Sequence, residues 1–221
     1  MNMTGIDLLT FARGTAFNWA LGVLIFGLLL RMFEMLSLGR KPDLSEPRAV
    51  KVGSGLRTLF TRSLPPPGMV KRSPVTYVGG YVFHIGFALV LLLFVPHIEV
   101  FRAVLGLHWP GLPTPVIDAI AVASMAAMLI VLIHRLTDKV KRFLSGFGDY
   151  LAWALTFLPL LTGYLALHHL LFDYTWMLAL HILSVEALMV LLPFTKLTHT
   201  VTVFFARWYN GEAFARKGVA S

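Results

Sequence analysis

Two histidines near the end of the chain, His181 and His199, lie 18 residues apart in the last apolar segment. Eighteen residues make five whole turns of an α-helix, so this spacing predicts both imidazoles on one face of a single helix, about 27 Å apart along its axis. That distance is close to the thickness of the hydrocarbon core of a bilayer. A helix with one imidazole near each side of a membrane is suited to hold two haems, one above the other. His84 and His97 of the second apolar segment are the candidate partners. The expected chemistry is electron transfer by a membrane cytochrome b.

The composition supports a membrane location for these histidines. The chain of 221 residues is 57% hydrophobic and only 14% charged, and its mean hydropathy is +0.75. A soluble domain of this length is far more polar. The sequence has no cysteine, which excludes disulfides, thiolate zinc sites, iron–sulfur clusters and covalently attached c-type haem. Its eight histidines are therefore the first candidates for axial metal ligands, and its nine methionines the second.

Five segments are apolar enough and long enough to cross a membrane as helices. They cover about residues 17–33, 77–95, 116–133, 150–171 and 176–197. The predicted fold class is an all-α membrane protein with five transmembrane helices, which form one haem-binding bundle over residues 1–221. No cleavable signal is expected, because no small-residue cleavage site follows a short apolar core near the N-terminus.

The basic residues predict the orientation of the spans. Of 19 Lys and Arg residues, nine lie in residues 31–72, four in residues 134–149 and four from residue 196 onward. Five spans put these three stretches on one side, and the positive-inside rule makes that side the cytoplasm. We therefore expect the N-terminus outside, the C-terminus in the cytoplasm, and a multi-pass protein of a bacterial or archaeal cytoplasmic membrane. The net charge of +8 then reflects topology, and a nucleic-acid partner is not expected.

The longest loop, residues 36–75, is basic and lies on the predicted cytoplasmic side. Its middle part, residues 49–64, is expected to form a short amphipathic helix on the membrane surface. The apolar side chains expected to face the membrane are those of Val52, Leu56, Leu59 and Phe60. Two interpretations of the loop remain open: a docking surface for a cytoplasmic partner, and a basic segment that binds anionic headgroups.

His84 is the strongest candidate ligand of the second span. It lies about two turns from the cytoplasmic end, and Gly80 is one turn earlier on the same face. A glycine beside an imidazole leaves room for a flat macrocycle, although it also suits close helix packing around a core histidine. An ionisable side chain at that depth is costly and usually functional. Because the second span runs outward and the fifth runs inward, His84 and His199 are expected to meet in the cytoplasmic half.

The partner of His181 in the outer half is less well defined by the sequence. His97 follows Pro96 at the outer end of the second span. In a straight helix His97 would point about 140° away from the face of His84, so its use requires Pro96 to end or kink the helix. His168 and His169, at the outer end of the fourth span, are the alternatives. The remaining candidates, His108 and His134, are expected to be interfacial residues.

The stretch Phe83-His84-Ile85-Gly86, together with the pair His181 and His199, resembles the gamma subunit of respiratory nitrate reductase. That family is a five-span di-haem cytochrome b of about this length. The resemblance implies that His84 and His199 hold the haem nearer the cytoplasm and that His181 holds the outer one. The family's second histidine on span two follows the first by ten residues. This sequence has Phe94 there, and the nearest histidine is His97.

The long loop after the first span differs from the nitrate reductase pattern. It is similar to relatives that serve heterodisulfide-reductase-like iron–sulfur proteins. The resemblance implies a subunit of a quinol-linked oxidoreductase with a cytoplasmic iron–sulfur or molybdenum partner. Quinol would be oxidised near the outer haem and electrons would leave from the inner haem.

Two other classes of function remain open at this stage. One is a single-haem or cofactor-free membrane anchor, and the other is a proton-translocating, transporter-like protein. The latter would use the histidines and Glu186, a carboxylate near the middle of the fifth span that is costly to bury. Glu186 is expected to be protonated, bonded to a neighbouring helix or part of a proton path. Candidates for a proton acceptor at a quinone site are Glu99, Arg102, His108, Asp118 and Asp173.

Overall fold

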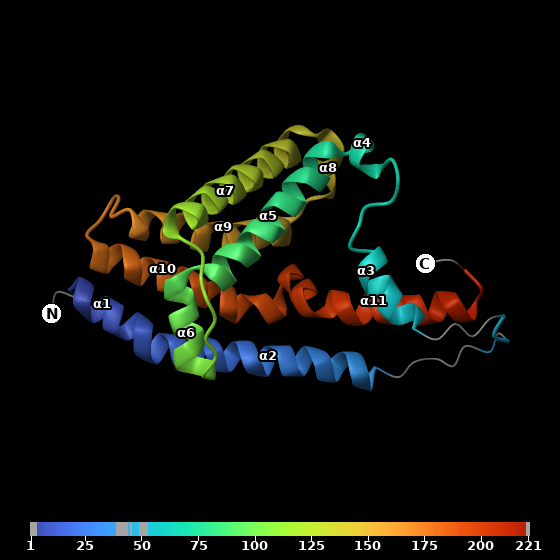
Figure 1. Ribbon diagram of the computed structural model, residues 1–221, viewed down its shortest axis with the longest axis horizontal. Helices are drawn as coiled ribbons and strands as arrows, with labels where there is room; N and C mark the ends of the chain where they lie inside the picture. The colour runs from blue at the N-terminus through green and yellow to red at the C-terminus, as the bar shows by residue number, and fades with distance from the viewer. Residues whose placement is uncertain (1–3, 39–43, 45, 49–52, 220–221) are drawn as a thin grey trace.

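The computed structural model describes residues 4–38, 44, 46–48 and 53–219. Within these ranges every regular element is a helix, and five helical stretches are long and apolar enough to span a membrane (Figure 1). They are Gly5–Ser37, Pro74–Leu93, Thr114–Thr137, Phe147–Leu167 and Tyr174–Phe194. The predicted all-α class and the prediction of five spans are confirmed. These helices fit a multi-pass membrane protein.

The first span has 33 residues and is much longer than its apolar sequence window predicted. It consists of α1 (Gly5–Phe11), a short π-helical segment η1 (Ala12–Ala16) and α2 (Phe17–Ser37). The helix begins early because Thr4 and Asp7 form a capping box, in which the Asp7 amide donates to Thr4 Oγ1 over 3.3 Å and the Thr4 amide donates to Asp7 Oδ2 over 2.9 Å. These bonds satisfy amides that the start of a helix leaves free.

The second and third spans, α5 (Pro74–Leu93) and α7 (Thr114–Thr137), pack closely against each other. Gly79 and Gly86 lie seven residues apart on the face of α5 that meets α7. A Cβ atom on Gly79 would lie 2.6 Å from Val131 Cγ2, and one on Gly86 would overlap the hydroxyl of Ser124, which is fully buried. The two backbones approach closely because glycine has no side chain at these crossings.

Replacing Gly86 with leucine is therefore expected to destabilise the fold by about 1–3 kcal/mol, the usual cost of overpacking. The measurement is thermal unfolding of the purified chain in detergent, followed by tryptophan fluorescence. Gly22→Leu in α2 is the control, because nothing lies within 4 Å of the Cβ position there. Equal unfolding temperatures for the two variants would contradict the close crossing.

The α9 helix (Phe147–Leu167) packs along α10 (Tyr174–Leu191), which also lies against the first span. In Figure 1 the first span and the line from α10 into α11 (His199–Arg216) run side by side along the long axis. Between α10 and α11 lie two short 3₁₀ segments, η2 (Leu192–Phe194) and η3 (Lys196–Thr198), separated by Thr195 in an extended conformation.

This break corrects the sequence interpretation that one continuous helix carries both His181 and His199. Pro193 has no amide hydrogen and opposes continuation of the helix. Side chains satisfy the carbonyls that the break frees. Thr198 Oγ1 lies 2.7 Å from the Pro193 oxygen and 3.0 Å from the Leu192 oxygen, and Arg31 Nε donates to the Pro193 oxygen over 2.8 Å. The five-turn spacing was therefore not the geometry that places the two imidazoles.

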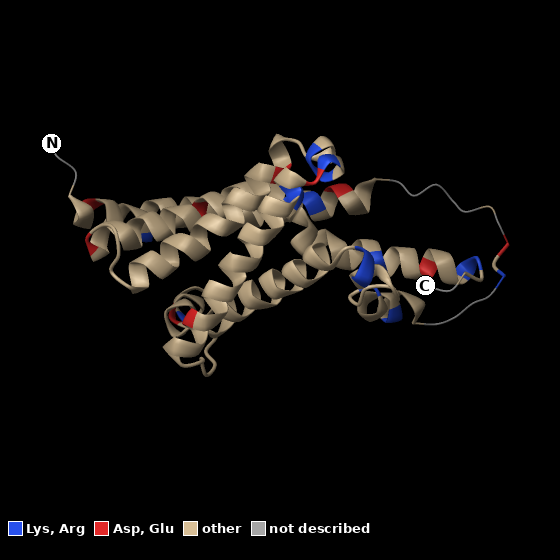
Figure 2. Cartoon of the chain, turned by 90° about the horizontal axis from the view of Figure 1, so that it is seen from above, with Lys and Arg blue, Asp and Glu red and all other residues tan. Residues whose placement is uncertain are grey.

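Three short helices lie at the end of the bundle that carries most of the Lys and Arg residues (Figure 2). They are α3 (Ser54–Thr61), α4 (Met69–Arg72) and α8 (Lys139–Leu144). The α3 helix packs on α11, where the Gly55 amide donates to Glu212 Oε1 over 2.7 Å. The expected amphipathic helix is thus confined to α3, with Leu56 and Phe60 exposed. Val52 lies outside the described residues.

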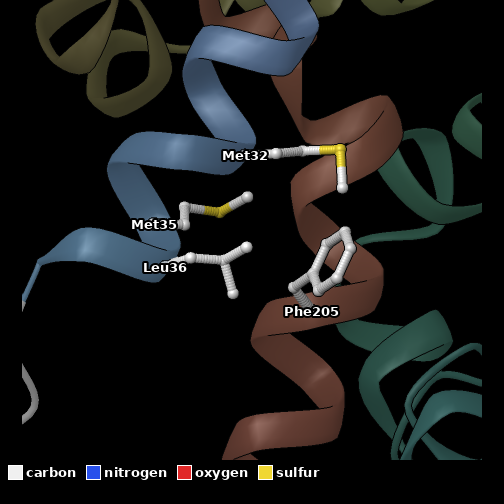
Figure 3. A pocket seen from close by; sticks show the side chains of 4 residues that line it. All are labelled: Met32, Met35, Leu36 and Phe205. Carbon is white, nitrogen blue, oxygen red and sulfur yellow. The ribbon is translucent and has the colours of Figure 1, made fainter.

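The start of α11 also packs against α2. Met32, Met35 and Leu36 of α2 and Phe205 of α11 line a small apolar pocket between the two helices (Figure 3). Flexible methionine side chains adapt to irregular gaps of this kind. The pocket shows that α11 lies beside the first span beyond the break at Thr195.

Candidate functional site

His84 and His199 face each other across two elements that are far apart in sequence. His84 lies in the middle of α5, and His199 is the first residue of α11. Their ring centroids are 6.2 Å apart, with an interplanar angle of 69°. Both side chains are exposed in the isolated chain. The structure thus brings together the two histidines that the sequence assigned to the cytoplasmic half.

His97 and His181 form a second pair. Their ring centroids are also 6.2 Å apart, and the rings are inclined by 21°. His97 lies in α6 (Val95–Leu105), a separate helix that starts after α5 has ended at Leu93. Pro96 occupies the first turn of α6, where proline is tolerated. The 140° mismatch of a straight helix therefore does not arise, because the chain turns at Phe94, which adopts an extended conformation.

Backbone carbonyls fix the orientation of three of the four rings. The Nδ1 atoms of these rings approach carbonyl oxygens three to seven residues earlier in the chain: His84 to Gly80 at 2.7 Å, His199 to Lys196 at 2.7 Å and His97 to Val90 at 3.0 Å. A carbonyl oxygen only accepts, so Nδ1 carries the proton and Nε2 keeps its lone pair. This is the usual arrangement of metal-binding histidines.

The ring of His181 has a different support, which comes from α9. Thr162 Oγ1 lies 3.3 Å from His181 Nδ1 and 2.7 Å from the carbonyl oxygen of Leu158. A hydroxyl that donates to Leu158 is free to accept from Nδ1, which again leaves Nε2 as the nitrogen with the lone pair. The next residue, Gly163, gives the ring its space: a Cβ there would lie 3.0 Å from His181 Cε1.

Burial lowers the pKa of His97 because desolvation disfavours the charged ring. The imidazole therefore remains neutral near pH 7. A neutral ring with a free Nε2 is the form that binds a metal.

The spacing within each pair fits a single metal ion between two imidazoles. Two metal–nitrogen bonds of about 2.0–2.1 Å and two ring radii of about 1.1 Å give roughly 6.3 Å between centroids. Both pairs are at 6.2 Å. Among the described residues, no three His, Cys, Asp or Glu side chains gather into a metal site. Each imidazole pair could supply two ligands to a metal whose other ligands come from a macrocycle.

Open space lies beside the first pair of histidines, at Gly80. Gly80 lies one turn from His84, and nothing lies within 4 Å of the Cβ position on Gly80. By contrast, Gly79 and Gly86 on the same helix face closely packed neighbours. Gly80, the glycine predicted beside the imidazole of His84, is thus the one with open space next to it.

The other histidines have different surroundings. His168 lies 3.2 Å from Asp118, His169 stacks on Tyr174 with centroids 4.8 Å apart, and His108 lies 3.7 Å from Glu99. His134 lies in the last turn of α7. The ring that lies 6.2 Å from that of His181 belongs to His97, so the geometry favours His97 over His168 and His169 as its partner.

Thr162 and Gly163 were not among the site residues predicted from the sequence. Neither residue type stands out in an apolar segment, where threonine and glycine are common at helix contacts. The signal that could have found them is their adjacency on α9, since a hydroxyl and an absent side chain together can orient and accommodate a ring.

The fold and these residues define a class: a multi-pass helical protein in which two imidazole pairs join α5 and α6 to α10 and α11. A protein of Nitratidesulfovibrio vulgaris (strain Hildenborough), whose name reads only "Protein", is 33% identical to this chain over 148 residues. The match covers 66% of this chain and 65% of that relative. No family model matches the chain. No solved structure matches it.

Proposed function

We propose that this chain is the membrane cytochrome b subunit of a respiratory oxidoreductase complex. It passes electrons between the quinone pool and a cytoplasmic partner through two b haems, with quinol oxidation as the favoured direction. The observation that carries the proposal is the presence of two imidazole pairs, each with ring centroids 6.2 Å apart.

His84 and His199 would hold one haem, and His97 and His181 the other. Each bound haem would supply one-electron transfer, and two histidine ligands to each iron would leave no coordination site free for oxygen chemistry. The chain's own contribution is orientation: three carbonyls and Thr162 hold the rings with Nε2 free. Such contacts to the second ring nitrogen also raise the basicity of a ligand.

The charge distribution supports the proposed orientation in a bacterial or archaeal cytoplasmic membrane. The Lys and Arg residues gather around α3, α4, α8 and the end of α11 (Figure 2). By the positive-inside rule this end faces the cytoplasm, and of the two imidazole pairs the one with His199 lies on α11, the helix that leads into it. The His84–His199 pair is thus the exit for electrons, and the His97–His181 pair lies toward the outer, quinone side.

The proposed partner is a cytoplasmic iron–sulfur or molybdenum protein. The α3–α11 arm, which consists of Ser54–Thr61 and His199–Arg216, provides the docking surface. Its exposed apolar residues include Leu56, Phe60 and Phe204, and exposed aromatic and apolar side chains among basic residues are typical of protein interfaces.

The test is the haem content per polypeptide of the purified chain, determined as pyridine haemochrome, for the wild type and for His97→Ala. We expect two haems in the wild type and one in the variant, because a single imidazole does not hold an iron that two held. Two haems in both proteins would assign the outer ligand to another residue. A colourless wild type would contradict the cytochrome proposal.

The same purified sample tests the proposed reaction with quinol separately from haem binding. Addition of a short-chain quinol is expected to reduce the haems, which is visible in the Soret region. Haems that dithionite reduces but quinol does not would leave a cytochrome without a quinone site.

A further inference from the structure

The first span meets α10 through a row of small residues. The buried residues of α1, η1 and α2 are Gly5, Ala12, Ala20 and Gly27. Their spacings are seven, eight and seven residues. The longer step contains the π-helical segment Ala12–Ala16, whose wider turn takes up one additional residue. The π segment thus keeps all four small residues on one face.

The opposing face of α10 has its own regular row. Ala179, Glu186 and Pro193 are seven residues apart, and all three are buried. The two ends of the contact fix the register, since Gly5 lies against Trp176 and Gly27 lies against Pro193. We call this contact between the first span and α10 the α2–α10 seam. Glu186 therefore lies in the middle of the seam, opposite the stretch that contains Ala20.

Glu186 is the unusual member of the seam. Its relative exposure is 5%, and Oε1 is buried without a hydrogen-bond partner. In this respect it is unique among the buried side-chain atoms of the described residues. A carboxylate in such a position would lose its hydration without gaining a counter-charge, which is strongly unfavourable in a membrane.

The ionisable groups on the elements packed against α10 do not compensate Glu186. Arg31 bonds to Glu34 and to the Pro193 carbonyl, Asp149 pairs with Lys196, and Asp7 caps α1. Arg13 of η1 is exposed. The tyrosines of α9, Tyr150 and Tyr164, form no bond with Glu186 in the described structure, since its Oε1 has no partner.

We propose that Glu186 is a proton-binding site in the membrane core, where it holds a proton as a neutral carboxylic acid within the α2–α10 seam. Five residues along a helix correspond to a rotation of about 140°, so Glu186 lies on a different face of α10 from His181. The proton site is therefore separate from the imidazole pairs, and it does not depend on whether they bind haem.

The test uses the full chain in detergent micelles and the apolar reagent dicyclohexylcarbodiimide, which reacts with protonated carboxylic acids in apolar surroundings. The acid proton passes to a carbodiimide nitrogen, and the carboxylate oxygen bonds to the central carbon. The adduct then rearranges to a stable N-acylurea without loss of atoms. We expect a single adduct on the peptide that contains Glu186, found by mass spectrometry, and no adduct there with a water-soluble carbodiimide.

Glu186→Gln provides the first control and is expected to abolish the adduct. Glu34, a carboxylate paired with Arg31 at 2.8 Å, is the internal control and is expected to stay unlabelled by the apolar reagent. Failure of the apolar reagent to label Glu186, or equal labelling by the water-soluble reagent, would overturn the proposal.

Infrared spectroscopy tests the same site without a reagent and without requiring the variant to be as stable as the wild type. The wild type is expected to show the carbonyl stretch of a protonated carboxylic acid that persists at pH values where exposed carboxyl groups are ionised. Its absence from the wild type would overturn the proposal. Haem content measured on the same samples keeps the outcome for Glu186 distinct from that for the cytochrome function.

Discussion

Replacing either His84 or His199 with alanine is expected to remove one haem of two, and replacing both is expected to remove no more. The two ring centroids lie 6.2 Å apart, so both histidines are needed to complete one site. Two residues that act as a unit show this non-additive behaviour. A double variant with one histidine from each pair, such as His84→Ala with His181→Ala, is expected to lose both haems. The measurement is pyridine haemochrome per polypeptide on purified protein.

His134→Ala is the matched control for this series. His134 also lies near the basic end of a span, in the last turn of α7, but within the described part of the chain no ring contact joins it to another histidine. Its haem content is expected to equal that of the wild type. If the double variant His84→Ala/His199→Ala lost both haems, the assignment of these two histidines to one haem would be wrong. This would hold even if all four histidines were ligands.

Replacing Gly163 with valine is expected to remove the haem of the His97–His181 pair and leave the other haem in place. A Cβ atom at Gly163 would lie 3.0 Å from His181 Cε1. Valine adds further atoms on a stiff side chain, so the ring of His181 must turn away from its position opposite His97. The expected haem content falls from two to one per polypeptide.

Gly148→Val on the same helix is the control for Gly163→Val. The nearest atom to a Cβ at Gly148 is Lys196 Cε at 3.9 Å, an ordinary contact with a flexible side chain. Two haems are expected in this variant. Retention of both haems in Gly163→Val would show that His181 does not need its observed orientation, and loss of both would indicate that the bundle as a whole is disturbed.

The spans and the His84–His199 pair were accessible from the sequence, whereas the partner of His181 was left open among His97, His168 and His169. Apolar length alone identifies five membrane-crossing segments, because a bilayer requires about 20 such residues. The pairing of His84 with His199 follows from the opposite directions of the second and fifth spans. The sequence made the use of His97 conditional on Pro96 ending or kinking the helix, and α5 does end at Leu93, before Pro96.

The path of the chain at the end of the fifth span was not accessible in this way. An 18-residue spacing matches five turns of a helix, yet the chain breaks at Pro193 and Thr195 and begins again at His199. The break is stabilised by Arg31 and Thr198, and Arg31 comes from a distant part of the sequence. Hydrophobic periodicity indicates which helix faces are buried. It does not indicate which backbone carbonyls will accept a hydrogen bond from a side chain that is distant in sequence.

The support of His181 by Thr162 and Gly163 is a similar case. The contact depends on how α9 is turned against α10, and a uniformly apolar helix gives no periodic signal for its rotation. The packing of α3 on α11 was missed for a different reason, because the apolar face of this short helix was expected to lie on the membrane surface. Gly55 and Gly211 allow this close approach, and they are glycines without any distinctive sequence context.

The break between α10 and α11 has a mechanical consequence. The backbone hydrogen-bond ladder that supports His181 ends at Leu191, and a different helix begins at His199. That second helix continues into the arm that packs on α3. A protein that binds this arm would thus shift the His199 ring and leave the His97–His181 pair undisturbed. Under the proposed function, partner binding and electron transfer from the His84–His199 site would then both depend on α11.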